Sequence, residues 1–127
     1  MKLNYLNLKI IATLLITLML VICSGPITYK SNNKTIELSE DDPFQIVLEG
    51  DSNSDYQWEL ISKKTYVKLL KPVTISTETD KTTYTFDFKT LSDGEQIIKL
   101  IYTDGEIIED EFTVTIIVGT IGLITAD

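Results

Sequence analysis

Short runs of alternating apolar and polar residues recur from Lys34 to Val118, and this pattern limits the fold more than any other feature of the chain. In the clearest run, Tyr84, Phe86 and Phe88 are separated from one another by single polar residues. Side chains two positions apart lie on one face of a strand, whereas a helix places them on opposite sides. No segment after the first 23 residues carries the apolar stripe of a helix. The sequence therefore predicts an all-β chain.

Residues typical of turns separate these runs at short intervals. We predict about seven strands, at 34–39, 44–49, 56–60, 66–70, 84–89, 96–103 and 112–118. Such a series over about a hundred residues is typical of an antiparallel β-sandwich of immunoglobulin-like type. The polar stretch 73–83 is expected to include an exposed loop near 79–81. Six aromatic side chains should supply much of the core: Phe44, Trp58, Tyr84, Phe86, Phe88 and Phe112.

The first 23 residues have the features of an export signal. Residues 1–9 hold two lysines and no acid, and residues 10–22 are apolar except for threonines, which is the length of a signal-peptide core. Cys23 follows directly, so two outcomes stay open: lipidation of Cys23, as in a bacterial lipoprotein, or a leader without lipid. We expect a leader or signal peptide at 1–23, a linker at 24–33, the sandwich at 34–118 and a loose tail at 119–127. The predicted location is the cell envelope, periplasm or extracellular space.

Three features of the composition exclude many kinds of activity. The chain has no histidine, which is the commonest general base and metal ligand, and Cys23 is its only cysteine. Catalysis by a Cys–His pair, thiolate zinc sites and a disulfide within the domain are therefore excluded. The formal net charge of −8 disfavours nucleic acid, because phosphate binding needs cationic side chains. We predict a protein that is not an enzyme and needs no cofactor or metal.

A polar loop leads directly into the strand that carries Trp58, the only tryptophan. Side chains of these types bond their own backbone and favour loops, and a loop held on a rigid strand is a common place for binding. Trp58 shares the parity of Tyr56 and Leu60, so we expect it in the core and not at a contact surface. The residues of the loop are Asp51, Ser52, Asn53, Ser54 and Asp55.

The same loop also fits the opening of a calcium loop, with oxygen ligands at alternate positions. An EF-hand would place glycine at Tyr56 and glutamate at Ser62, and the chain has neither there. A solvated loop without metal is the expectation.

The order of these features resembles the chagasin family of cysteine-peptidase inhibitors over most of 34–118. The loop running into Tyr56-Gln57-Trp58-Glu59-Leu60 is similar to the family's Asn-Pro-Thr-Thr-Gly loop and the aromatic-x-Trp strand that it enters. The segments 86–102 and 111–114 are similar to the family's later strands and the turn between the first two. The resemblance implies a sandwich whose three loops at one end block the cleft of a papain-like peptidase as a rigid wedge, without chemistry.

The resemblance also implies which residues would contact the peptidase. Residues 51–55 occupy the place of the Asn-Pro-Thr-Thr-Gly motif, of which only a hydroxyl is kept, at Ser54. The family's glycine-rich loop falls at about 76–82, and its Arg-Pro-Trp loop falls at 103–107. Residues 73–83 hold no glycine, and the chain has no arginine at any position. The second contact loop of our prediction is Thr103, Asp104, Gly105 and Glu106.

Two functions follow and remain open at this point. The first is an exported proteinase inhibitor that binds papain-type cysteine peptidases through these loops. The alternative is a non-inhibitory immunoglobulin-like interaction or structural module of the cell envelope. In either case we expect a monomer that does not bind nucleic acid and that meets a membrane only through the leader or a lipid on Cys23.

Overall fold

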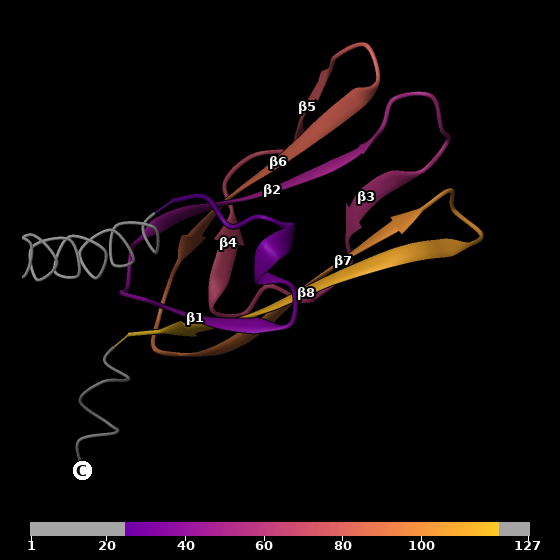
Figure 1. Ribbon diagram of the computed structural model, residues 1–127. Coiled ribbons are helices and arrows are strands. Elements are labelled where there is room, and N and C mark those ends of the chain that lie inside the picture. Colours follow the sequence, from indigo (N-terminus) through magenta and orange to yellow (C-terminus); the bar gives the residue numbers. More distant parts are fainter. Residues whose placement is uncertain (1–24, 120–127) are drawn as a thin grey trace, which may run out of the picture.

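The computed structural model describes residues 25–119, which form two facing β-sheets (Figure 1). The predicted leader at 1–23 with Cys23 and almost all of the predicted tail at 119–127 lie outside the described residues. Eight strands build the two sheets, so the all-β, immunoglobulin-like sandwich is confirmed. Within residues 25–119, no helix is long and apolar enough to span a membrane.

The first sheet has the strand order β1-β8-β7-β3. Its strands are β1 (Lys34–Leu38), β3 (Gln57–Leu60), β7 (Gly94–Thr103) and β8 (Ile108–Val118). β7 and β8 form a long antiparallel hairpin, and the Asp104-Gly105 pair between them is a residue pair typical of hairpin turns. β1 runs parallel to β8, although we expected an antiparallel sandwich. No hairpin joins these two strands, so their relative direction is not set by a turn.

The second sheet has the order β2-β6-β4, with β5 also paired to β6. Its strands are β2 (Pro43–Asp51), β4 (Val67–Leu69), β5 (Thr74–Thr77) and β6 (Lys81–Thr90). β5 is the strand that the sequence did not predict. All four of its residues are exposed, so it carries no alternation of buried and exposed side chains.

The segment 24–33, which we expected to be a linker, packs against the sandwich from residue 27 onward. Ile27 is buried and lies beside Ile46 of β2, with its backbone bonded to Gln45 and Val47 at 2.8 Å each. A single 3-10 turn, η1 (Tyr29–Ser31), follows.

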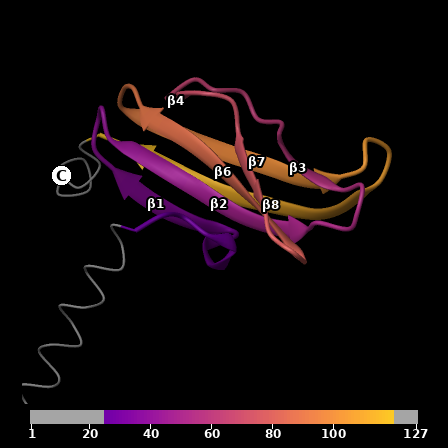
Figure 2. The same cartoon turned by 90° about the horizontal axis from the view of Figure 1, so that it is seen from above.

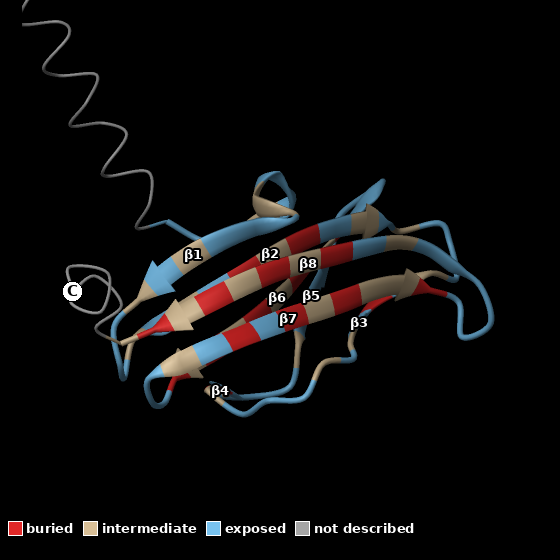
Figure 3. Cartoon of the chain, turned by 90° about the horizontal axis from the view of Figure 1, so that it is seen from below, coloured by how far each residue is buried: buried red, intermediate tan, exposed pale blue. Residues whose placement is uncertain are grey.

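The core lies between the sheets, where buried and more exposed residues alternate along β7 and β8 (Figure 3). Five of the six predicted core aromatics are buried, and Phe44 is half-buried and stacks on Phe88 with ring centres 5.2 Å apart. The predicted core is therefore confirmed.

Both ends of the described chain lie at one end of the sandwich (Figures 1 and 2). Gly119 donates its backbone N–H to the carbonyl of Leu38, the last residue of β1, at 2.9 Å. The β2–β3, β5–β6 and β7–β8 loops lie at the opposite end.

Candidate functional site

Three loops come together at the end of the sandwich that is remote from the chain ends (Figure 2). We call them together the loop end: the β2–β3 loop (52–56), the β5–β6 loop (78–80) and the β7–β8 loop (104–107). The Ser52 hydroxyl donates to the carbonyl of Thr79 at 3.1 Å, which joins the first loop to the second. Burial raises the pKa of Tyr56, and the nearby charges of Asp104 and Glu109 raise it further. The ring of Tyr56 contacts Tyr102 on β7, two residues before the third loop, with ring centres 5.6 Å apart, so the first loop lies beside the third.

Aromatic side chains form the base of the loop end. Trp58 is 5% exposed, and its indole N–H donates to the carbonyl of Glu49 at 3.0 Å. Its neighbour across β3 and β7 is Tyr102, and the two ring centres are 5.2 Å apart. Tyr102 also contacts Tyr56, and the centres of these two rings are 5.6 Å apart. Trp58 is thus a core residue beneath the loops, as its parity predicted.

The first loop is held by its own polar side chains. Asp51 accepts the N–H of Asn53 at 2.8 Å, and Ser54 Oγ accepts the N–H of Tyr56 at 3.2 Å. The Tyr102 hydroxyl accepts the N–H of Asp51 at 3.0 Å and lies 3.3 Å from Ser54 Oγ. Of the five predicted contact residues, Ser52 is half-buried and the other four, Asp51, Asn53, Ser54 and Asp55, are exposed. Within residues 25–119, no group of three acidic side chains is placed to hold a metal ion.

The second loop is a short turn at the ends of β5 and β6. Glu78 donates its N–H to the carbonyl of Lys81 at 2.7 Å, which closes the turn. The ammonium of Lys81 lies 3.3 Å from the carboxylate of Glu49 on β2. Residues 78–80 are exposed, as expected for the loop that we predicted near 79–81.

The third loop is fixed by two side chains. Asp104 accepts the N–H groups of Ile107 and Glu106 at 2.8 and 2.9 Å. Thr103 donates its hydroxyl to the carbonyl of Ile107 at 2.6 Å and accepts the N–H of Gly105 at 3.0 Å. Of the predicted contact residues, Asp104, Gly105 and Glu106 are exposed, whereas Thr103 is buried and holds the loop from below.

The sequence did not single out two features of the loop end. The Tyr102 hydroxyl supports the first loop, but the sequence placed Tyr102 only within the strand predicted at 96–103. Ile107 and Ile108 are exposed at 58% and 51%, and β8 begins at Ile108, four residues before the strand that we predicted at 112–118. An isoleucine beside a turn signal, with no polar residue in alternation, is the signal that could have marked them.

Acidification should release the third loop, because its hydrogen bonds need the ionised form of Asp104. The N–H groups of Ile107 and Glu106 lower the pKa of Asp104 below its ordinary value of 3.8. A carboxyl whose pKa is lower in the folded state stabilises that state above the unfolded pKa, and loses this effect as pH falls through the folded pKa. We expect the NMR signals of both amides to titrate with a midpoint below pH 3.8.

The variant Asp104→Ala should speed hydrogen exchange at those two amides already at pH 7, whereas Asp55→Ala should not. A titration midpoint at or above the ordinary value would contradict this account of the loop.

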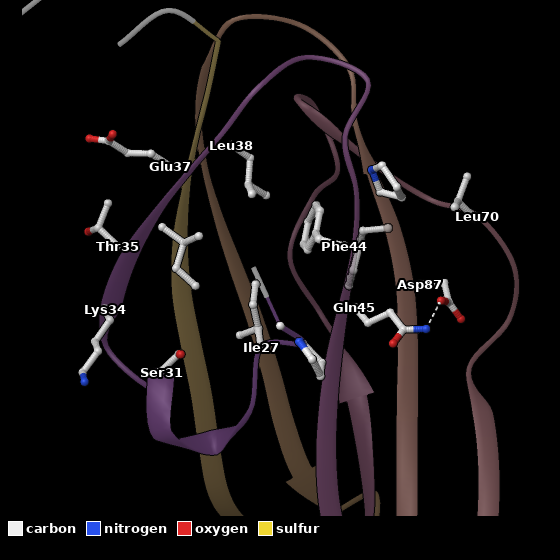
Figure 4. Close-up of a pocket in the computed structure, with 15 residues that line it drawn as sticks. Ile27, Ser31, Lys34, Thr35, Glu37, Leu38, Phe44, Gln45, Leu70 and Asp87 are labelled. Carbon is white, nitrogen blue, oxygen red and sulfur yellow. Dashed lines mark hydrogen bonds between the residues drawn. The ribbon is translucent and has the colours of Figure 1, made fainter. Parts of the chain in front are cut away.

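A pocket of about 900 Å³ lies away from the loop end, along the edge where β1 and β2 face each other (Figure 4). Ile27, Leu38 and Phe44 line it, and Gln45 donates its side-chain N–H to Asp87 at 2.8 Å at one side. This pocket is an opening between the edges of the two sheets. The loop end, with its three fixed loops, is the stronger candidate for a binding site.

Comparison with known proteins gives matches among solved structures only. No family model matches the chain, and no curated protein matches it. The cysteine protease inhibitor EhICP2 from Entamoeba histolytica is 22% identical, with 74% of this chain and 93% of that chain covered and a TM-score of 0.64. Amebosin is 20% identical, with 74% and 96% covered and a TM-score of 0.54. These two structures share the fold of this chain, so the predicted chagasin-like scaffold is confirmed.

Proposed function

We propose that this chain is an exported inhibitor of papain-type cysteine peptidases, and that its loop end enters the active-site cleft of the peptidase. The observation that carries this proposal is the loop end itself: three loops, each fixed by hydrogen bonds, side by side on one end of a rigid scaffold. One protein with the same fold is described as a cysteine protease inhibitor.

The physical basis of such inhibition is preorganisation. Ordering a flexible side chain or loop on binding costs roughly 0.5–1.5 kcal/mol for each immobilised side chain, and loops that are already ordered avoid this loss. At the loop end, Tyr102, Asp104 and Thr103 hold the backbones of the first and third loops before any partner arrives. The contact residues would be 51–55 in the first loop and Asp104, Gly105 and Glu106 in the third.

A second candidate function is a non-inhibitory interaction module on the same scaffold. The observation that favours it is the composition of the first loop. Asp51, the last residue of β2, and Asp55 in the loop stand where the resembling family has asparagine and glycine, and the proline of that motif is absent.

Titration against papain and a cathepsin L-type enzyme separates the two functions. If the protein is an inhibitor, it should inhibit at least one of the two enzymes stoichiometrically and remain uncleaved. Ser54→Ala should raise the inhibition constant by about tenfold, because it removes the hydroxyl that bonds the Tyr56 N–H, and one such bond contributes about 0.5–1.5 kcal/mol.

The matched control is Ser92→Ala, in an exposed turn outside the loop end. Absence of inhibition at micromolar concentration would favour the interaction module. Inhibition that is equally strong in both variants would place the contact elsewhere.

A further inference from the structure

Charge is distributed unevenly between the loop end and the rest of the domain. The loop end and the strand residues that flank it (49–56, 76–82 and 103–109) hold eight acids and one lysine, whereas the rest of 25–119 holds ten acids and eight lysines. Most of the net negative charge of the described chain therefore lies at the loop end. The eight acids are Glu49, Asp51, Asp55, Glu78, Asp80, Asp104, Glu106 and Glu109, and all are exposed.

Only three of these carboxylates make a hydrogen bond or ion pair within residues 25–119. Asp51 and Asp104 bond backbone N–H groups of their loops, and Glu49 pairs with Lys81. The side chains of the other five make no hydrogen bond or ion pair within residues 25–119: Asp55, Glu78, Asp80, Glu106 and Glu109. Like charges gathered on one surface repel one another, so these five do not stabilise the free domain. Burial raises the pKa of Tyr56, and the charges of Asp104 and Glu109 raise it further, which is in accord with a negative potential there.

An apolar side chain projects from the same surface. Ile107 is 58% exposed, and three acids lie close to it in the chain: Asp104, Glu106 and Glu109. Its backbone is fixed on both sides, because its N–H bonds Asp104 and its carbonyl accepts the Thr103 hydroxyl. An exposed apolar side chain on a fixed backbone, surrounded by charged residues, matches the usual arrangement of an interface, which has an apolar centre and a polar rim.

We propose that the loop end is built for a partner with a basic surface around an apolar depression that accepts Ile107. The proposal rests on the function proposed above, within which it selects the target: a papain-type peptidase with lysine and arginine side chains on the rim of its cleft. The carboxylates then act mainly on the rate of association, and Ile107 acts on the rate of dissociation.

Association and dissociation rates test the proposal with the full chain and two papain-type peptidases, one with a basic and one with an acidic cleft rim. The triple variant Glu78→Gln, Glu106→Gln, Glu109→Gln should associate with the basic-rim enzyme about tenfold more slowly at low ionic strength. The difference should disappear in about 0.5 M salt, where the Debye length falls below about 5 Å. The matched control is Glu37→Gln, Glu59→Gln, Glu95→Gln, which removes three exposed charges outside the loop end and should change the rate by less than about twofold.

Ile107→Ser should speed dissociation about tenfold at every salt concentration, because the anchor loses its apolar contact. The control Ile97→Ser replaces an isoleucine that is 55% exposed on β7, outside the loop end, and should have no effect. Equal inhibition of the two enzymes, with rates that do not depend on the loop-end glutamates, would overturn this proposal and leave the inhibitory function intact. Inhibition of neither enzyme would overturn both.

Discussion

Replacement of Trp58 by alanine is expected to lower the free energy of unfolding by about 3–5 kcal/mol, as for other buried aromatic residues that are truncated to alanine. The indole is buried between the sheets, and its ring centre lies 5.2 Å from that of Tyr102 and 6.4 Å from that of Tyr29. Its N–H also bonds the carbonyl of Glu49 on β2, so the side chain joins the two sheets. Denaturant unfolding, followed by circular dichroism in the far ultraviolet, measures the change.

The control for this prediction is Trp58→Phe. Phenylalanine keeps most of the apolar contact but leaves the Glu49 carbonyl without its donor, which costs about 1–3 kcal/mol. The alanine variant should therefore be clearly less stable than the phenylalanine variant. Two variants of equal stability would show that the hydrogen bond, and not the packing of the ring, is the main contribution of Trp58.

Replacement of Tyr102 by alanine is expected to have the largest effect on the loop end. The ring packs against Trp58 and Tyr56, and its hydroxyl accepts the N–H of Asp51 and lies beside Ser54. Because the side chain is half-buried, its truncation should destabilise the fold by about 2–4 kcal/mol, somewhat less than for a fully buried aromatic. The first loop would also lose its support, so we expect the inhibition constant to rise about a hundredfold.

Tyr102→Phe separates the two roles of this residue. It keeps the ring and removes the hydroxyl, so stability should fall by only about 1 kcal/mol while hydrogen exchange at the Asp51 amide becomes faster. We expect the inhibition constant to rise about tenfold, because the first loop loses one of the hydrogen bonds that hold it. Unchanged exchange at Asp51 together with unchanged inhibition would mean that the hydroxyl does not hold the first loop.

The sequence predicted the parts of the fold that are buried. Tyr84, Phe86 and Phe88 alternate because one face of β6 is covered by the other sheet, and burial on one face is what alternation records. β5 was missed for the same reason, since neither of its faces is covered. The parallel pairing of β1 with β8 could not be predicted, because it joins segments about eighty residues apart and no turn residue encodes it.

The sequence predicted where the loops of the candidate site lie, but not how they are held in place. The short polar side chains of 51–55 and the Asp104-Gly105 pair mark loops, because such residues bond their own backbone. The roles of Tyr102 and Ser52 depend on partners 51 and 27 residues away, which no local pattern specifies. Ile107 was missed because an exposed apolar residue looks in sequence like the start of a strand.

The location of the chain ends has a consequence for how the molecule would stand on a surface. Both ends of the described chain lie at the end of the sandwich remote from the three loops. Cys23, which is lipidated under one of the two outcomes that the sequence leaves open, lies two positions before the first described residue, Gly25. A lipid tether at that point would orient the domain so that the loop end points away from the membrane, where its acidic loops stay accessible to a peptidase in solution.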